Sequence, residues 1–175
     1  MKLEELPPRG AGGAIHVVVE CPRGATQKLK WLPDLGVFTM HRPLPLGFAY
    51  PYDWGFVPGT SAEDGDPVDA LVVWDVASWP GVVVPCRPVG LLQLEQNATR
   101  GDSSRRIRND RILAVPLSDP RSAWLRSYED LQPRTREEIA HFFTSAVFFE
   151  GKDPEILGWD GPDAADALVD RSRRG

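Results

Sequence analysis

The sequence predicts an α+β fold in which short strands come first and two helices come last. β-Branched or alternating runs recur between residues 14 and 115, whereas helical spacing of apolar residues begins only at residue 134. The chain also contains 17 proline and 16 glycine residues, which favour short strands joined by turns. Several short strands at this spacing are typical of a barrel or a sandwich, and strands followed by helices indicate the α+β class.

The composition indicates one domain, residues 1–175, with the Pro- and Gly-rich residues 1–13 as an N-terminal arm. A net charge of −5 argues against a nucleic-acid partner. No run approaches the roughly 20 apolar residues of a membrane span, and the N-terminus lacks a signal-peptide pattern, so we expect no membrane partner. The two cysteines have no CxxC spacing, which predicts buried thiols in a reducing compartment and a cytoplasmic location.

Most predicted strands lie in the first two thirds of the chain. Residues 14–20 form a β-branched run. Residues 27–31 and 37–40 flank a Pro-Asp-Leu-Gly turn, which predicts a hairpin over 27–42. Residues 43–58 are too rich in proline, glycine and aromatic side chains to predict one element. Further strands are expected at 71–74, 82–84, 89–92 and 111–115.

The later segments are different in pattern. Residues 95–110 are polar and arginine-rich, which predicts a long hairpin or loop. Residues 134–149 carry apolar side chains at the spacing of an amphipathic helix. Those side chains are Ile139, Phe142, Phe143, Ala146 and Val147. Residues 163–173 predict a shorter helix, with Pro162 at its entry and arginines at its end.

The most informative stretch is an acidic turn with carboxylates at Asp64, Asp66 and Asp69. Gly65 and Pro67 prevent a regular helix there. Carboxylates held so close repel one another unless a cation lies between them, and Mg²⁺ prefers a few carboxylates with water and phosphate oxygens. A solvated acidic turn explains the same residue types, because Asp, Gly and Pro are common in turns.

Other charged residues precede and follow this turn. Glu20 ends the first predicted strand, Lys28 and Arg42 lie on or just after the predicted hairpin, and Asp110-Arg111 opens a later strand. Carboxylates with lysine and arginine suit a phosphate–metal complex, because the cations neutralise phosphoryl oxygens while the acids hold the metal. Surface salt bridges are the alternative interpretation of the same residues.

The motifs resemble soluble family I inorganic pyrophosphatase. The family signature, Asp-x-Asp-Pro-x-Asp followed by apolar residues, is matched by Asp64-Gly65-Asp66-Pro67-Val68-Asp69-Ala70-Leu71-Val72. Further matches are Val18-Val19-Glu20-Cys21-Pro22, Leu35-Gly36-Val37-Phe38, Tyr50-Pro51, Gly55-Phe56-Val57-Pro58-Gly59-Thr60, Cys86-Arg87-Pro88-Val89-Gly90, Ala114-Val115-Pro116 and Ile139-Ala140-His141-Phe142-Phe143. Their order and spacing hold from about residue 14 to residue 149.

The resemblance implies a five-stranded OB-like closed β-barrel with two C-terminal helices. It also implies Mg²⁺-dependent hydrolysis of pyrophosphate to two phosphates and assembly as a homo-oligomer. By position, the resemblance implies the following site residues: Glu20, Asp64 and Asp69 as metal ligands, Asp66 as general base, Tyr50 as an orienting residue, and Lys28 and Arg42 as phosphate ligands.

Several positions depart from the family pattern. Lys30 replaces an acidic residue, Trp54 replaces a tyrosine, and Ala146-Val147 replaces a Tyr-Lys pair. The family's Asp-rich loop reads Glu95-Gln96-Asn97, then the Arg-rich segment 100–111. A one-residue shift in register would let Asp110 supply a missing metal ligand and Arg111 the missing lysine. Lys152 could reach the site from beyond the helix.

Three functions therefore remain open at the sequence level. The first is a divergent Mg²⁺-dependent pyrophosphatase of reduced activity. The second is a hydrolase of a related phosphoanhydride or nucleotide, since Trp54 and the extra arginines could stack on a base. The third is a non-catalytic relative that binds a phosphate ligand.

Overall fold

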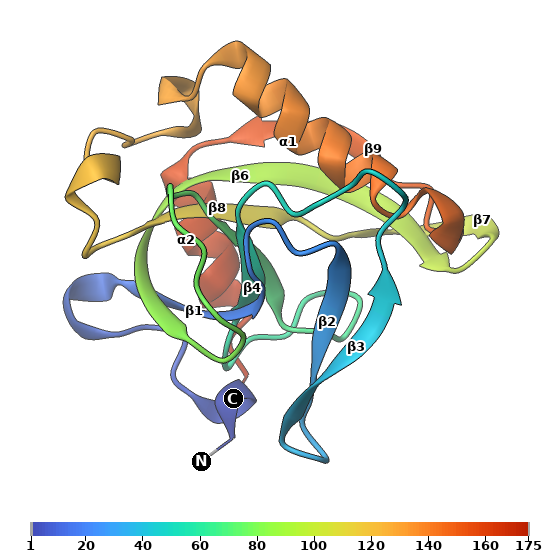
Figure 1. The fold of residues 1–175 in the computed structure, drawn as a ribbon, viewed down its shortest axis with the longest axis horizontal. Coiled ribbons are helices and arrows are strands. Elements are labelled where there is room, and N and C mark those ends of the chain that lie inside the picture. The colour runs from blue at the N-terminus through green and yellow to red at the C-terminus, as the bar shows by residue number, and fades with distance from the viewer. Residues whose placement is uncertain (1, 175) are drawn as a thin grey trace.

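The computed structural model describes residues 2–174 and contains a seven-stranded mixed sheet, a two-stranded hairpin and two α-helices (Figure 1). The strands are β1 (Ile15–Cys21), β2 (Gln27–Leu32), β3 (Val37–Pro43), β4 (Asp53–Val57), β5 (Val68–Val72), β6 (Val83–Thr99), β7 (Asp102–Arg108), β8 (Arg111–Pro116) and β9 (Glu155–Asp160). The helices are α1 (Pro133–Ser145) and α2 (Pro162–Arg171).

The large sheet follows the order β1-β4-β5-β8-β6-β7, and β9 pairs with β6. β5 and β8 run parallel, whereas the other pairs are antiparallel. β6 also pairs with β1, so the ladder that leaves β1 through β4 returns to it. This mixed sheet with two helices confirms the α+β prediction and fits the expected OB-like fold.

Two apolar clusters cover opposite faces of this sheet. Successive residues of a strand point to opposite faces, so neighbours in β5 join different clusters. Ala70 packs in the cluster that contains Val169 of α2, whereas Leu71 packs in the cluster that contains Phe142 and Phe143 of α1. The central strands are buried on both faces, and they hold the acidic turn in front of β5 and the start of β8 in fixed positions.

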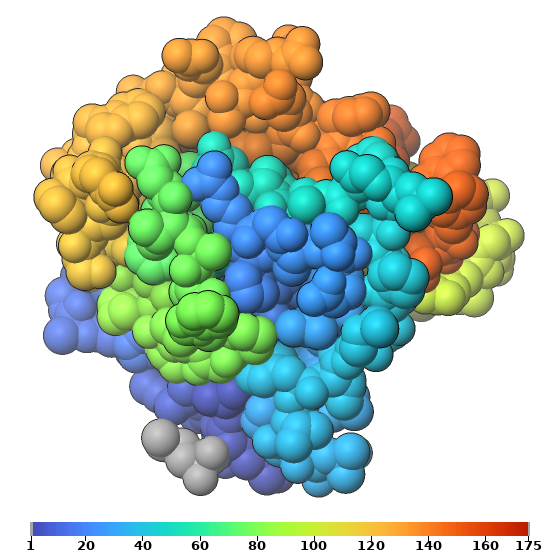
Figure 2. Space-filling view, viewed as in Figure 1, coloured from blue at the N-terminus to red at the C-terminus, as the bar shows by residue number. Residues whose placement is uncertain are grey.

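The hairpin of β2 and β3 forms a separate sheet, as the alternating pattern predicts. Lys28 and Arg42 are register partners across this hairpin. Its tip extends away from the large sheet, where Leu35 is 70% exposed (Figures 1 and 2). The hairpin therefore presents its cationic base, rather than its tip, to the rest of the molecule.

Several predicted boundaries were wrong. The separate strands expected at 82–84 and 89–92 are one strand, β6, which accommodates Pro88 through an irregularity before Gly90. β4 lies within residues 43–58, which lacked a recognisable pattern, and β9 lies between the helices. α1 ends at Ser145 rather than at residue 149, and a 3₁₀ turn, Phe148–Glu150, follows it.

The N-terminal arm is attached to the folded body. The amide of Gly59 donates to the carbonyl of Glu4, and Arg9 donates to Asp166 (2.8 Å) and Asp170 (3.0 Å) of α2. Among residues 2–174, no helix is both long enough and apolar enough to cross a membrane.

Candidate active site

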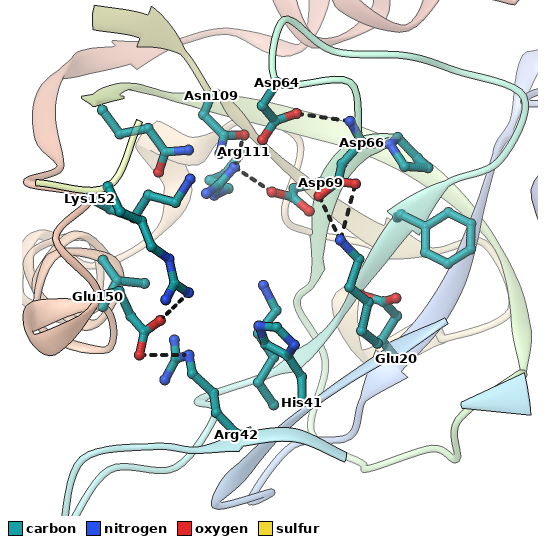
Figure 3. Close-up of a pocket in the computed structure, with 17 residues that line it drawn as sticks. Glu20, His41, Arg42, Asp64, Asp66, Asp69, Asn109, Arg111, Glu150 and Lys152 are labelled. Atoms are coloured by element: carbon teal, nitrogen blue, oxygen red, sulfur yellow. Dashed lines mark hydrogen bonds and ion pairs between the residues drawn. The ribbon is translucent and has the colours of Figure 1, made fainter. Parts of the chain in front are cut away.

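A cavity of about 250 Å³ lies where the acidic turn meets the hairpin of β2 and β3, the start of β8 and the segment after α1. Its lining is mostly charged, as Figure 3 shows. The lining residues are Glu20, Lys28, Lys30, His41, Arg42, Phe56, Asp64, Asp66, Pro67, Asp69, Gln96, Arg100, Asn109, Arg111, Val147, Glu150 and Lys152.

The acidic turn is a tight connection between β4 and β5. The amide of Ala62 donates to the carbonyl of Asp66, and the Asp64 carboxylate accepts from the amide of Asp66 (3.1 Å). Gly65 has φ of +84°, a backbone conformation that residues with a Cβ atom rarely adopt. Asp69 then enters β5 opposite Arg111 of β8. The turn thereby brings all three aspartates to one side of the cavity.

Asp69 is held by an arginine that is itself well supported. Arg111 lies 2.5 Å from the Asp69 carboxylate and also donates to Asn109. The Arg111 guanidinium lies over the rings of Trp54 (5.2 Å) and Phe143 (5.7 Å). Burial raises the pKa of Asp69, and Arg111 partly opposes that shift.

Asp66 is paired with Lys30, whose ammonium lies 3.0 and 3.1 Å from its two oxygens. Burial lowers the pKa of Lys30, but the contact with Asp66 outweighs this effect and raises it overall. Glu20 is buried at the end of β1, and its carboxylate accepts from the amide of Trp31 (2.8 Å). Burial raises the pKa of Glu20 to about 7, although the Trp31 amide and Lys28 oppose the shift. We call Glu20, Asp64, Asp66 and Asp69 the acidic wall.

Amide, apolar and cationic side chains form the other side of the cavity. We call Gln96, Asn109, Val147 and Lys152 the opposite wall; Asn109 lies where this group meets the acidic wall, beside Asp64 in Figure 3. Figure 3 shows Lys152 across the cavity from Asp66 and Asp69. The backbone of Lys152 is fixed because its carbonyl accepts from the amide of Asn97 (2.8 Å).

Glu150, next to the opposite wall, is paired with two arginines. Its oxygens lie 3.4 Å from Nε of Arg42 and 2.6 Å from Nη2 of Arg100. These pairs connect the hairpin of β2 and β3, the Arg-rich hairpin of β6 and β7, and the segment after α1. Three segments far apart in sequence are thereby joined at the rim of the cavity.

Most of the residues that the sequence singled out come together here. The structure places seven of them in the cavity lining: Glu20, Lys28, Arg42, Asp64, Asp66, Asp69 and Arg111. Lys152 also lines the cavity, as the sequence suggested.

Asp110 does not face this cavity, so its prediction as a metal ligand here was wrong. Its carboxylate accepts from Arg108 and from the amide of Leu94 (3.0 Å), and it lines a different cavity. Side chains alternate as β8 begins, so Asn109 and Arg111 face the site and Asp110 faces away.

Tyr50 and Trp54 lie below the site rather than in its wall. They are 5% and 4% exposed, stack at 6.3 Å and line a small adjoining cavity with Ala146. Burial raises the pKa of Tyr50, which keeps its hydroxyl neutral. Because Arg111 lies over the Trp54 ring, that ring offers no open face for stacking.

Sequence reasoning missed His41, Asn109 and Glu150 as lining residues. His41 could have been found from its position beside Arg42 in the predicted hairpin, and burial together with nearby cations lowers its pKa. Asn109 carries an amide, which is a weaker ligand for a hard cation than the neighbouring Asp110 carboxylate, so residue type alone does not select it. Glu150 gave no signal, since it follows a helix that ends earlier than its periodicity suggests.

Comparison with known proteins identifies the family of this chain. A sequence model described as inorganic pyrophosphatase matches residues 17–174. The chain belongs to the inorganic pyrophosphatase family. The inorganic pyrophosphatase of Nostoc sp. is 41% identical over 172 residues, which cover 98% of this chain and 97% of that protein. The relative from Thermus thermophilus is 38% identical over 154 residues, covering 86% and 83% of the two chains.

Solved pyrophosphatase structures share the fold. The crystal structure of the Thermus thermophilus enzyme aligns with a TM-score of 0.89 at 35% identity, covering 98% of this chain and 97% of that one. The Helicobacter pylori enzyme aligns with a TM-score of 0.85 at 29% identity, covering 96% of each chain. The family-level prediction from the motifs is therefore confirmed.

The donor chemistry of the acidic wall fits a hard divalent cation, because carboxylate oxygens are the ligands that Mg²⁺ prefers. In the structure, however, Asp66 and Asp69 contact Lys30 and Arg111. Within residues 2–174, no three His, Cys, Asp or Glu side chains converge tightly enough to form a preformed metal cluster. Metal binding at this wall would therefore have to displace side-chain cations.

Proposed function

We propose that this chain hydrolyses pyrophosphate to two phosphates with Mg²⁺ as cofactor. The observation that carries the proposal is the single cavity in which Asp64, Asp66 and Asp69 face Lys28 and Arg42. Acids that hold a metal and activate water are needed on one side of the phosphorus, and cations that neutralise phosphoryl oxygens on the other. Membership of the inorganic pyrophosphatase family supports the same reaction.

The acidic wall would hold the metal and activate water. Glu20, Asp64 and Asp69 are the proposed ligands, and Asp66 is the proposed base that accepts a proton from the attacking water. The metal, when bound, supplies positive charge to the phosphoryl oxygens and lowers the pKa of its water. Asp66 is half-exposed beside Lys30, so water can reach it once that ammonium moves.

Lysine and arginine residues would hold the phosphates. Lys28, Arg42, Arg111 and Lys152 all line the cavity and can donate to phosphoryl oxygens. Trp54 would act by supporting the Arg111 guanidinium from below. Tyr50 stacks on Trp54 and would fix that platform.

The test is phosphate release from pyrophosphate, with and without Mg²⁺, by the native chain and by Asp66→Asn. We expect turnover in Mg²⁺ and a loss of about 10²–10⁴-fold in the variant, the range of general-base catalysis. Asp34→Asn, on the exposed turn of the hairpin, removes a carboxylate without touching the cavity and should leave turnover unchanged. Release by Asp66→Asn equal to that of the native chain would contradict the proposal.

A second candidate is a non-catalytic phosphate-binding protein. The specific observation in its favour is the opposite wall, where Gln96 and Asn109 are neutral amides and Val147 is apolar. The same assay separates the two, since a binding protein would take up pyrophosphate without releasing phosphate. Nucleotide hydrolysis has less support because Arg111 lies over the Trp54 ring; phosphate release from nucleoside triphosphates tests it.

The Arg-rich segment gives no support to a nucleic-acid partner. Arg100, Arg106 and Arg108 each contact at least one carboxylate, and Arg105 is the one arginine of residues 100–108 without an ion pair among residues 2–174. A single unpaired arginine supplies little of the positive charge that a phosphate backbone requires. We infer that the hairpin of β6 and β7 instead stabilises the rim of the cavity, where Arg100 pairs with Glu150.

We also infer one domain over residues 1–175, a closed barrel, a homo-oligomeric assembly and a cytoplasmic location. The β1–β6 ladder supports closure of the barrel.

Exposed Phe148 (74%) and Phe149 (79%) support self-association, since adjacent exposed aromatic side chains mark contact surfaces. The buried free thiols Cys21 and Cys86 suit a reducing compartment. Light scattering after size-exclusion chromatography tests the assembly.

A further inference from the structure

The cavity has an excess of positive side chains over negative ones. Its carboxylates are Glu20, Asp64, Asp66, Asp69 and Glu150, and its lysines and arginines are Lys28, Lys30, Arg42, Arg100, Arg111 and Lys152. With all of them ionised, the five acids and six bases give the described lining a net charge of +1. An anion with several negative charges therefore meets a pocket that does not repel it.

Two carboxylates of the acidic wall are paired with cationic side chains. Lys30 contacts both oxygens of Asp66 (3.0 and 3.1 Å), and Arg111 contacts Asp69 (2.5 Å), as the dashed lines in Figure 3 mark. A paired carboxylate repels an incoming anion less than a free one, because the field of its partner offsets its charge. Lys30 and Arg111 thus perform, in part, the charge neutralisation expected of a metal ion.

Cationic groups also remain to receive an anion. Within residues 2–174, Lys28 and Lys152 line the cavity without an ion-pair partner. Arg111 also lines the cavity, although it is only 9% exposed. Guanidinium N–H groups that line the cavity can donate to an anion.

We propose that this cavity binds a pyrophosphate-type anion without any divalent cation, with Lys30 and Arg111 acting as built-in counter-ions for Asp66 and Asp69. The proposal rests on the proposed function for the chemical class of the ligand. It adds that the ligand enters metal-free, and that metal is required for turnover rather than for binding.

The test is calorimetric titration with methylenediphosphonate, a non-hydrolysable analogue of pyrophosphate, in EDTA at 0.15 M salt. We expect saturable one-to-one binding, with a Kd within about tenfold of the value in Mg²⁺. Binding that occurs in Mg²⁺ but is absent in EDTA would overturn the proposal.

Lys30→Glu is the decisive variant, because it reverses one charge in the cavity. In EDTA we expect binding about 10- to 100-fold weaker than in the native chain, with most of the loss restored by Mg²⁺. Arg134→Glu makes the same charge change on an exposed face of α1 outside the cavity and should bind like the native chain. Equal binding in EDTA by Lys30→Glu and the native chain would place the anion elsewhere and overturn the proposal.

Lys152→Ala provides a second test that does not disturb the acidic wall. Its loss should weaken binding in EDTA roughly tenfold, and Lys152→Arg should retain most of the affinity. Identical affinity in Lys152→Ala would contradict the assigned anion position. Thermal melts of each variant distinguish a lost contact from a lost fold.

Failure of this inference and failure of the proposed function give different results. Phosphate release in Mg²⁺ without analogue binding in EDTA would support the proposed hydrolysis and contradict metal-free binding. Analogue binding in EDTA without phosphate release in Mg²⁺ would support metal-free binding and favour the non-catalytic protein.

Discussion

The acidic wall and the opposite wall of the cavity differ in what they offer a phosphate–metal complex. The acidic wall keeps the full set of carboxylates that the signature motif predicts, Asp64, Asp66 and Asp69. The opposite wall presents the amides of Gln96 and Asn109, whereas the resemblance implied an Asp-rich loop with Asp110 as a substitute metal ligand. One half of the site can hold a metal by carboxylates alone, and the other half cannot.

The two walls therefore offer a ligand different kinds of charge. The opposite wall has no carboxylates, and Arg111 and Lys152 bring positive charge to the cavity without a metal. Fixed cations are already in place before the ligand arrives, which favours binding of a phosphate anion. They cannot activate a water molecule, so turnover depends on the acidic wall.

The largest expected effect comes from Asp69→Asn, which removes a central ligand of the acidic wall. We expect Mg²⁺ affinity to fall at least about 100-fold, since an amide binds a hard cation far less well than a carboxylate. Asparagine can still accept from Arg111, so the melting temperature should change by only a few degrees, roughly the effect of 1 kcal/mol. Calorimetry with Mg²⁺ and a thermal melt measure both, with Asp34→Asn as control. Unchanged affinity would mean that the metal lies elsewhere.

Ionisation of the buried Glu20 should lower the free energy of unfolding at high pH. Burial raises the pKa of Glu20 from 4.5 to about 7. The stability that comes from neutral Glu20 is therefore fully present below about pH 4.5 and is lost as the pH rises through about 7. The loss is on the order of 3 kcal/mol. Glu20→Gln keeps an acceptor for the Trp31 amide but cannot ionise.

Urea denaturation in EDTA at pH 5 and pH 8.5 measures this effect. The free energy of unfolding of the native chain should fall relative to that of Glu20→Gln as the pH rises. Parallel pH profiles for the two proteins would show that Glu20 ionises without cost.

Arg111→Ala tests the cation that lies between the two walls. It removes the partner of Asp69 and the contact with Trp54, so kcat/KM for pyrophosphate should fall about 10- to 100-fold. Arg111→Lys should recover only part of the loss, because an ammonium keeps the charge but not the planar contact. Steady-state kinetics measure both variants, and equal kcat/KM in all three proteins would remove Arg111 from the site.

The smallest effect is expected from Asn109→Asp, which gives the opposite wall a carboxylate. Mg²⁺ affinity should rise several-fold, limited by competition from the adjacent Arg111. Asn97→Asp is the matched control, since Asn97 lies on β6 outside the cavity lining. Calorimetry with Mg²⁺ compares them, and a larger gain in Asn97→Asp would mean that the walls have been assigned wrongly.

Elements with a clear period were predictable from the sequence, whereas elements defined by their partners were not. The hairpin of β2 and β3 shows alternation and a turn, so its pairing followed directly. β4 is buried throughout and lies among glycine and aromatic residues, so it shows no alternation. β6 is continuous only because it changes partners along its length, from β1 to β8 and then to β9 and β7.

The same distinction applies to the site. Asp64, Asp66 and Asp69 lie in one short motif, so their convergence could be predicted. Lys152 and Glu150 reach the cavity from a turn after α1, a position that depends on tertiary packing rather than on local pattern. The choice between Asn109 and Asp110 depended on a single residue of register at the start of β8, which only the paired strands define.

In the proposed site, metal lies at the acidic wall, and Arg111 and Lys152 bind the phosphates on the other side of the cavity. The most direct measurement is anomalous diffraction from a crystal of the chain grown with Mn²⁺ and methylenediphosphonate. We predict manganese peaks beside Asp64, Asp66 and Asp69, and analogue oxygens within hydrogen-bond distance of Arg111 and Lys152. Manganese held by Gln96 and Asn109 instead, with no peak at the three aspartates, would contradict the account.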